Sequence, residues 1–311
     1  MGKIANRAVI CEKLLEYAKE DSRICIVTSD SRGSASLTPF ANQYPDRVIE
    51  VGIAEQDLVG IGAGLASAGM KPYVASPACF LTMRSIEQIK VDAAYSKTNV
   101  KLIGISAGVS YGALGMTHHS LQDIAILAAI PHITIIAPAD RYETAKMMDA
   151  LQEYEGPVYI RVSRNPVDDV YSNTDFDYQI GKANILKDGN DITLIAYGDM
   201  VNVIDKASQL LEGQGIHARV INMHTIKPLD EDAIIKAAQE TKGIIVVEEH
   251  SVYNGLGSLV SQVVCSHYPC PVKTIALPDD TLVTGEAQEL FDHYGLTKEN
   301  IAHLAKEMLE D

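Results

Sequence analysis

Short apolar runs, rich in β-branched residues and bounded by turn residues, recur along the whole chain. Runs of this length predict buried strands of parallel sheets, because helices cover both faces of such strands. The predicted strands are residues 24–28, 100–105, 133–136, 158–162, 192–197, 218–221 and 244–247.

The segments between these runs place apolar residues at helical spacing. The predicted helices are residues 8–19, 86–95, 142–152, 201–213 and 230–241. Strands that alternate with helices predict an α/β layered fold with doubly wound sheets.

The segment NPVDDVYSNTDFDYQIG, residues 165–181, carries Asp, Asn, Ser and Pro without a sustained apolar period. This composition is typical of a linker, and a new series of strands and helices begins after it. A chain of 311 residues is long enough for two cores of ordinary size. We therefore predict two domains, residues 1–170 and a smaller one at residues 181–311.

The charge balance is acidic, with 26 Lys and Arg against 41 Asp and Glu and a formal net charge of −15. An acidic surface repels the phosphates of nucleic acids and anionic membranes, so we expect neither as a partner. Any phosphate-bearing ligand then requires a local positive site.

The five cysteines are odd in number and scattered, and no CxxC pair occurs. This pattern predicts neither a disulfide framework nor a zinc site. The chain shows no apolar run of signal-peptide length near its start and no stretch of about 18 apolar residues. We expect a soluble, cytoplasmic protein that supplies no metal ligands.

The segment VIEVGIAEQDLVGIGAG, residues 48–64, predicts a strand, a tight turn and a helix that begins near Glu55. Glu55 would then lie at the carboxyl edge of the sheet, where open parallel sheets bind ligands. The small residues of the helix would allow another subunit or domain to approach closely. Alternatively, Glu55 only complements the positive end of the helix.

The segment SAGVSYGALGMTHHS, residues 106–120, predicts a glycine-rich loop after a strand. Its spacing fits neither a P-loop nor a dinucleotide fingerprint, so no nucleotide site is expected. His118 and His119 end this loop, and adjacent histidines point in different directions. We expect one to carry protons and the other to be structural.

The sequence YIRVSRNP places Arg161 and Arg164 at the end of a predicted strand. A guanidinium there could bind a phosphate through paired hydrogen bonds. The alternative is a surface salt bridge, which is common for arginine.

Several of these segments resemble the transketolase family. GIAEQ, IANR, GSASLTP, THH and RVSR are similar to segments of its pyrimidine-binding domain, in the same order. HTIKPLDEDAI and IIVVEEHSVYNGLGS are similar to its C-terminal domain. The resemblance covers essentially the whole chain and assigns these two domains to residues 1–170 and 181–311.

The resemblance implies a thiamine diphosphate site. Glu55 corresponds to the glutamate that binds N1′ of the aminopyrimidine, where a carboxylic acid favours the imino tautomer needed to deprotonate the thiazolium. Arg84 and the ring-stacking position, Phe80 or Leu81, are further implied cofactor residues. The register of the family segment points to Leu81, and Phe80 lies one residue away.

The resemblance also implies substrate residues. Arg7, Ser34 and Arg164 correspond to ligands of a sugar phosphate, and His118 to a histidine near the reacting carbonyl and hydroxyl groups. His119 replaces a glutamine of the family segment.

Two further positions depart from the family pattern. Leu114 stands where an aspartate usually reads ketose hydroxyls, and Ser106 stands where a histidine usually binds phosphate. The identity of the sugar therefore stays open, with sulfonated or branched ketoses as admissible as a pentose phosphate.

The Gly-Asp-Gly motif with a downstream Asn, which holds metal and diphosphate in the family, is absent from the sequence. We therefore expect a separate subunit to bind the diphosphate with Mg²⁺ or Ca²⁺, in a two-plus-two heterotetramer. The expected reaction moves a two-carbon ketol unit from a ketose, phosphorylated or otherwise anionic, to an aldose. The alternatives are a beta subunit of a 2-oxoacid dehydrogenase decarboxylase component and a non-catalytic regulatory subunit.

Overall fold

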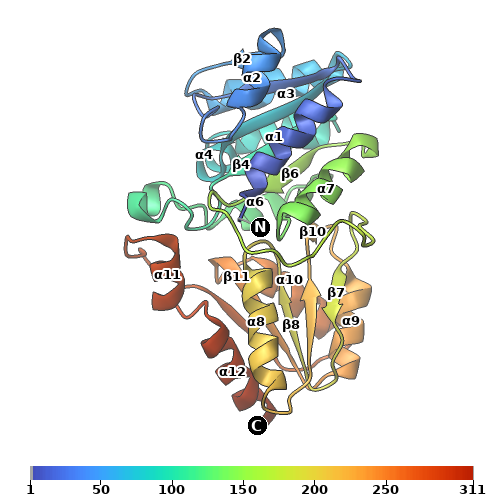
Figure 1. Cartoon of the computed structure of the whole chain (residues 1–311), viewed down its shortest axis with the longest axis vertical. Coiled ribbons are helices and arrows are strands. Elements are labelled where there is room, and N and C mark those ends of the chain that lie inside the picture. The colour runs from blue at the N-terminus through green and yellow to red at the C-terminus, as the bar shows by residue number, and fades with distance from the viewer. Residues whose placement is uncertain (1–2, 311) are drawn as a thin grey trace.

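The computed structural model describes residues 3–310 and contains two sheets, one above the other along the long axis of the molecule (Figure 1). Helices cover both sheets, and the predicted α/β fold is confirmed. None of the helices within residues 3–310 is long and apolar enough to cross a membrane.

The first sheet has seven strands, all parallel except the edge strand β10. Their order is β10 (Thr225–Lys227), β5 (Thr134–Ile136), β6 (Val158–Arg161), β4 (Lys101–Ile105), β3 (Lys71–Pro77), β1 (Ile24–Thr28) and β2 (Val48–Glu50). Strands β1 and β4 are buried throughout, as continuous apolar runs between two helical layers require.

Helices cover both faces of this sheet, so that a separate hydrophobic core lies on each side. They are α1 (Asn6–Tyr17), α2 (Thr38–Gln43), α3 (Glu55–Ser67), α4 (Ala78–Arg84), α5 (Ile86–Gln88), the π-helix η2 (Ile89–Tyr95), α6 (Asp123–Ala128) and α7 (Arg141–Glu153), with short 3₁₀ turns η1 (Pro45–Arg47) and η3 (Gly112–Thr117).

The second sheet has five strands, parallel except for the edge strand β7. Their order is β12 (Val272–Leu277), β11 (Ile244–Ser251), β8 (Ile192–Ala196), β9 (Ala218–Asn222) and β7 (Asn184–Lys187). The helices around it are α8 (Met200–Glu212), α9 (Glu231–Glu240), α10 (Leu256–His267), α11 (Ala287–His293) and α12 (Lys298–Glu310).

The two halves are joined by more than the linker. Strand β10 follows β9 in the chain but pairs with β5 at the edge of the first sheet. One hydrophobic core also runs from Leu102 of the first sheet to Ile195 and Ile221 of the second. The C-terminal half is therefore packed against the layer that carries the candidate site.

The apolar runs predicted strands correctly wherever they were long, and residues 24–28 coincide with β1. They did not predict β3, whose sequence KPYVASP contains two prolines although it pairs with strands on both sides. They also did not predict the short β10, which only its contact with β5 makes a strand. The limits at residues 170 and 181 stay a prediction, and residues 1 and 311 lie outside the described residues.

Candidate active site

A rigid turn connects β2 to α3. Glu50 ends β2, and its Oε1 accepts hydrogen bonds from the backbone N–H of Asp30 at 2.6 Å and of Gly52 at 3.0 Å. Gly52 has a φ of +69°, a conformation that costs glycine little and other residues more. The turn fixes the direction of α3 and places Glu55 as its first residue.

Glu55 is only 3% exposed, yet its carboxylate has a charged partner. Nη1 of Arg84, the last residue of α4, donates to Oε1 at 3.0 Å and to Oε2 at 2.9 Å. The start of α3 adds the positive end of the helix dipole. A hollow of about 500 Å³ opens beside the pair and is lined by residues 53–57 and Arg84. Glu55 thus holds its charge at the boundary between core and solvent.

Phe80 and Leu81 occupy different environments on α4. Leu81 is completely buried in the hydrophobic core and has no surface for a ligand ring. Phe80 is partly exposed, and the guanidinium of Arg84 lies 4.1 Å from its ring centroid. The structure thus leaves Phe80, and not Leu81, as the candidate for ring stacking. Its contact with a cofactor stays a prediction.

The adjacent histidines also differ. His118 is partly exposed and makes edge contacts with Phe80 and Tyr111, at centroid distances of 5.1 and 5.6 Å. His119 is 3% exposed, and its Nε2 lies 3.3 Å from the carbonyl oxygen of Gly112. Burial lowers the pKa of His119, which favours a neutral ring. His119 is therefore the structural histidine of the pair.

Two arginines lie together at the other end of the site. Nε of Arg7 donates to the backbone oxygen of Arg164 at 3.0 Å, and Nη1 donates to the backbone oxygen of Ser34. The guanidinium of Arg164 lies 5.0 Å from the ring centroid of Tyr111. Burial and the charge of Arg164 lower the pKa of Arg7. No ion pair within residues 3–310 neutralises either arginine, which favours an anionic ligand there.

These contacts form one continuous series across the surface. It runs from Arg7 through Arg164, Tyr111, His118, Phe80 and Arg84 to Glu55. Sequence reasoning missed Tyr111, because an aromatic residue in a glycine-rich loop has no signature of its own.

Ser106 and Leu114 stand apart from this series. Ser106 follows β4 with a φ of 56° and is 1% exposed, and its hydroxyl has no hydrogen-bond partner within residues 3–310. Leu114 lies on η3 and is 53% exposed. The expected roles of both in sugar binding stay predictions.

Arg161 is not a surface arginine. It is buried, its Nε donates to Asp123 at 2.9 Å, and its Nη2 donates to the backbone oxygen of Glu249 at 2.9 Å. A buried guanidinium with these partners binds the two halves together. Of the two arginines in the motif, Arg164 is the one available to a ligand.

The site fits one end of thiamine diphosphate. A buried carboxylate and an exposed aromatic ring match a planar, nitrogen-containing heterocycle. The other end needs metal and diphosphate ligands, and no group of three or more His, Cys, Asp or Glu side chains within the described chain could hold a metal ion.

Two α/β domains with this carboxylate define the pyrimidine-binding half of a thiamine diphosphate-dependent enzyme. Residues 2–168 match the transketolase pyrimidine binding domain, and residues 181–301 match the transketolase C-terminal domain. The chain belongs to the transketolase family.

Its relatives include separate subunits of split enzymes. One of the two subunits of the apulose-4-phosphate transketolase of Phocaeicola vulgatus is 50% identical over 312 residues, covering 99% of this chain and 100% of the relative. The 6-deoxy-6-sulfo-D-fructose transketolase subunit SqwH of a Clostridium species is 35% identical over 304 residues, covering 98% and 94%.

A solved structure described as a split gene transketolase, inactive beta4 tetramer, is 35% identical and has a TM-score of 0.89. The match covers 99% of each chain. This chain thus corresponds to the C-terminal subunit of a split transketolase, as the motifs indicated.

Proposed function

We propose that this chain, with a separate diphosphate-binding subunit, transfers a two-carbon ketol unit from an anionic ketose to an aldose. The carrying observation is the continuous series of contacts that joins Glu55 to the two unneutralised arginines Arg7 and Arg164. A ketose with an anionic end can extend along this series. The C2–C3 bond of the donor breaks, a new bond forms to the aldose carbonyl carbon, and no net oxidation occurs.

Thiamine diphosphate supplies the nucleophilic carbon and the electron sink for this chemistry when it is bound. Glu55 would hold a proton at the ring nitrogen of the aminopyrimidine, and Phe80 would support the ring face. The burial of Glu55 excludes water from this contact, so that its proton is shared with the ligand and not with solvent.

His118 is positioned for the substrate's protons. Its Nδ1 lies 2.9 Å from Oγ1 of Thr117, and its Nε2 has no hydrogen-bond partner within residues 3–310. A base must accept the proton of the donor 3-hydroxyl as the C2–C3 bond breaks, and an acid must protonate the oxygen of the aldose carbonyl. His118 can perform both steps because one ring nitrogen remains free.

Arg7 and Arg164 would bind the anionic end of the sugar, beside the partly exposed Ser34. We take phosphate as the anion and a branched ketose such as apulose 4-phosphate as the first donor to test, because the 50% identical relative is named for it. The exposed apolar Leu114 supports a donor with fewer hydroxyl groups on that side. A sulfonated ketose is the competing substrate.

The partner would hold the diphosphate and Mg²⁺ or Ca²⁺. A surface on α3, α4 and η2 supports a subunit contact, since Ile53, Met83 and Tyr95 are 71%, 55% and 81% exposed. On α3, Gly64 has no atom of the described chain within 4 Å of where a Cβ would lie, which leaves room for a neighbouring backbone. We propose a two-plus-two heterotetramer closed across this surface, in the cytoplasm.

The test combines this chain with its diphosphate-binding subunit, thiamine diphosphate and Mg²⁺, and measures aldose formation from apulose 4-phosphate and an aldose acceptor. Turnover should require both subunits and should be absent with either alone. Turnover of a 2-oxoacid with an electron acceptor, or a partner fully active without this chain, would contradict the proposal.

A further inference from the structure

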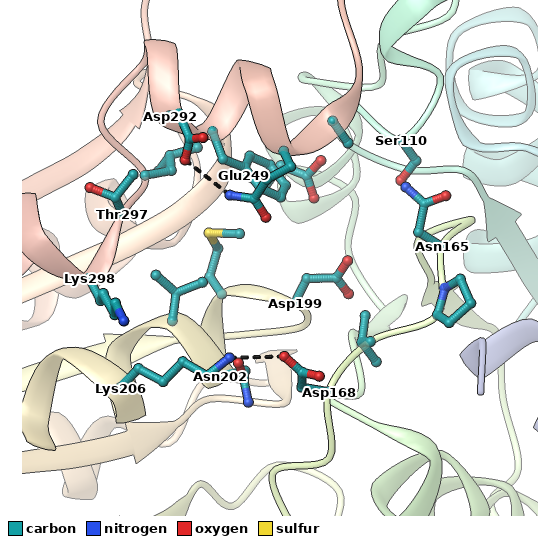
Figure 2. Close-up of a pocket in the computed structure, with 18 of the residues that line it drawn as sticks. Ser110, Asn165, Asp168, Asp199, Asn202, Lys206, Glu249, Asp292, Thr297 and Lys298 are labelled. Carbon is teal, nitrogen blue, oxygen red and sulfur yellow. Dashed lines mark hydrogen bonds and ion pairs between the residues drawn. The ribbon is translucent and has the colours of Figure 1, made fainter. Parts of the chain in front are cut away.

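A cavity of about 500 Å³ separates the loop of residues 106–120 from the C-terminal half (Figure 2). Ser110 of the loop and Asn165 of the linker line one side, and the start of α8 and the segment from α11 to α12 line the other. Glu249, near the end of β11, and Asp199, before α8, both contribute carboxyl groups to this cavity. The C-terminal half thus reaches the loop that carries Tyr111 and His118.

Glu249 holds the loop directly. It is 3% exposed, and its Oε1 accepts a hydrogen bond at 2.6 Å from the backbone N–H of Val109, which is itself completely buried. A buried N–H that loses its acceptor is strongly unfavourable, so this bond constrains where the loop can go.

The sequence of the loop is adapted to this carboxyl group. Gly108 has a φ of +62°, and a Cβ at this position would lie 2.1 Å from Cδ of Glu249. Only glycine allows the backbone to approach so closely in this conformation. Gly108 also forms an isolated bridge with Ser120, which closes the base of the loop.

Other bonds from the end of β11 secure the same region. The backbone N–H of Ser251 donates to the backbone oxygen of Leu121 at 3.0 Å, and the backbone oxygen of Glu249 accepts from Arg161 at 2.9 Å. These bonds fix β11 against the base of the loop. Among the contacts from this strand, the Glu249 side chain reaches farthest toward Tyr111.

We infer that Glu249 is a positioning residue for ketol transfer, which sets the placement of Tyr111 and His118 through the Val109 amide. This inference rests on the proposed function. It gives the C-terminal domain, from which no catalytic part was expected, a direct effect on the active-site loop.

The surroundings of Glu249 define the variant to use. Burial raises its pKa to about 8, against the opposing charge of Arg161 and with further upward shifts from Asp199 and Asp123. The carboxyl group is therefore largely neutral near pH 7. Glutamine retains the acceptor oxygen for Val109 without the charge, whereas alanine removes the acceptor.

Glu248 provides a matched control on the same strand. It is completely buried, and its carboxylate accepts from the backbone N–H groups of Leu256 at 2.8 Å and Gly257 at 2.9 Å. These amides begin α10 inside the C-terminal half. Glu248→Ala thus removes a buried acceptor of the same kind without touching the loop.

The first measurement is hydrogen exchange of the isolated wild-type chain and its variants, which does not depend on activity. Glu249→Ala should lose protection in residues 106–120, Glu248→Ala should lose it at the start of α10, and Glu249→Gln should resemble wild type. Unchanged protection of residues 106–120 in Glu249→Ala would overturn the inference. If Glu249→Ala fails to fold, Gly108→Ala replaces it, with Gly215→Ala as control, since Gly215 has a φ of +79° and open space around it.

The second measurement is steady-state kinetics in the complex with the diphosphate-binding subunit. Glu249→Ala should lower kcat/KM for the ketose roughly tenfold or more, because small displacements of catalytic groups are costly. Its affinity for thiamine diphosphate should stay unchanged, and Glu249→Gln should restore turnover. Equal kinetic effects of Glu249→Ala and Glu248→Ala would overturn the inference, whereas an inactive wild-type complex would count against the proposed function alone.

Discussion

One guanidinium nitrogen of Arg84 donates to both carboxylate oxygens of Glu55, at 3.0 and 2.9 Å. Glu55 is almost completely buried, whereas the Arg84 side chain is 46% exposed. The pair therefore lies across the boundary between core and solvent. The arginine satisfies the carboxylate while leaving the adjacent hollow open to a ligand and to another subunit.

Glu55→Gln should reduce ketol transfer by several orders of magnitude in the complete complex, on the order of 10²–10⁴ for its proton-transfer role alone. A neutral amide cannot supply the proton at the pyrimidine nitrogen. The control is Asp57→Asn, which removes an exposed carboxylate from the same hollow. Steady-state rates decide the matter, and full activity of Glu55→Gln would refute the assigned role.

Arg84→Met should lower the free energy of unfolding of the isolated chain by about 1–3 kcal/mol, because a buried carboxylate loses its hydrogen-bond donor. Arg84→Lys should recover part of this loss, since an ammonium group can still donate. Urea denaturation of the three proteins provides the comparison. Equal stability of Arg84→Met and wild type would show that solvent replaces the arginine.

Arg164→Ala should raise KM for a phosphorylated ketose roughly tenfold or more, with a smaller change in kcat, because it removes a charge-assisted contact to the anion. Arg23→Ala is the control, since Arg23 is exposed and pairs with Asp21. The Arg164→Ala substitution should have little effect on an unphosphorylated analogue. An unchanged KM for the phosphorylated ketose would exclude Arg164 from anion binding.

The two histidines should separate stability from activity. His118→Ala should lower kcat about 10²-fold or more with little change in Tm, because the partly exposed ring is assigned to proton transfer. His119→Ala should lower Tm, because it empties a buried position of the loop. Thermal denaturation and kinetics of both variants test this, and the reverse pattern would contradict the assignment.

Glu249 should make stability depend on pH. Its pKa rises from 4.5 in the unfolded chain to about 8 in the folded protein, chiefly through burial. The folded state thus binds the proton more tightly, so the associated stability is complete below about pH 4.5 and is lost as pH rises through about 8. Glu249→Gln should flatten the decline in the free energy of unfolding over this range. An unaltered pH dependence would show that Glu249 does not titrate there.

Local patterns predicted the elements that carry the site. The run ICIVT predicted β1, and the turn in VGIAEQ predicted a helix beginning at Glu55. Both depend on interactions between near neighbours in the chain. Strand β10 could not be predicted this way, because three residues become a strand only through β5, about 90 positions earlier in the chain.

The sequence by itself determined the α/β fold, the family and the residue types available for chemistry, because hydrophobic periodicity and motif spacing are properties of neighbouring positions. Only the tertiary structure decided between Phe80 and Leu81, between His118 and His119, and between Arg164 and Arg161. Adjacent side chains point to different surroundings, and packing selects which of them remains accessible. The link from Glu249 to Val109 spans 140 positions and exists only because two separately folded sheets meet at this loop.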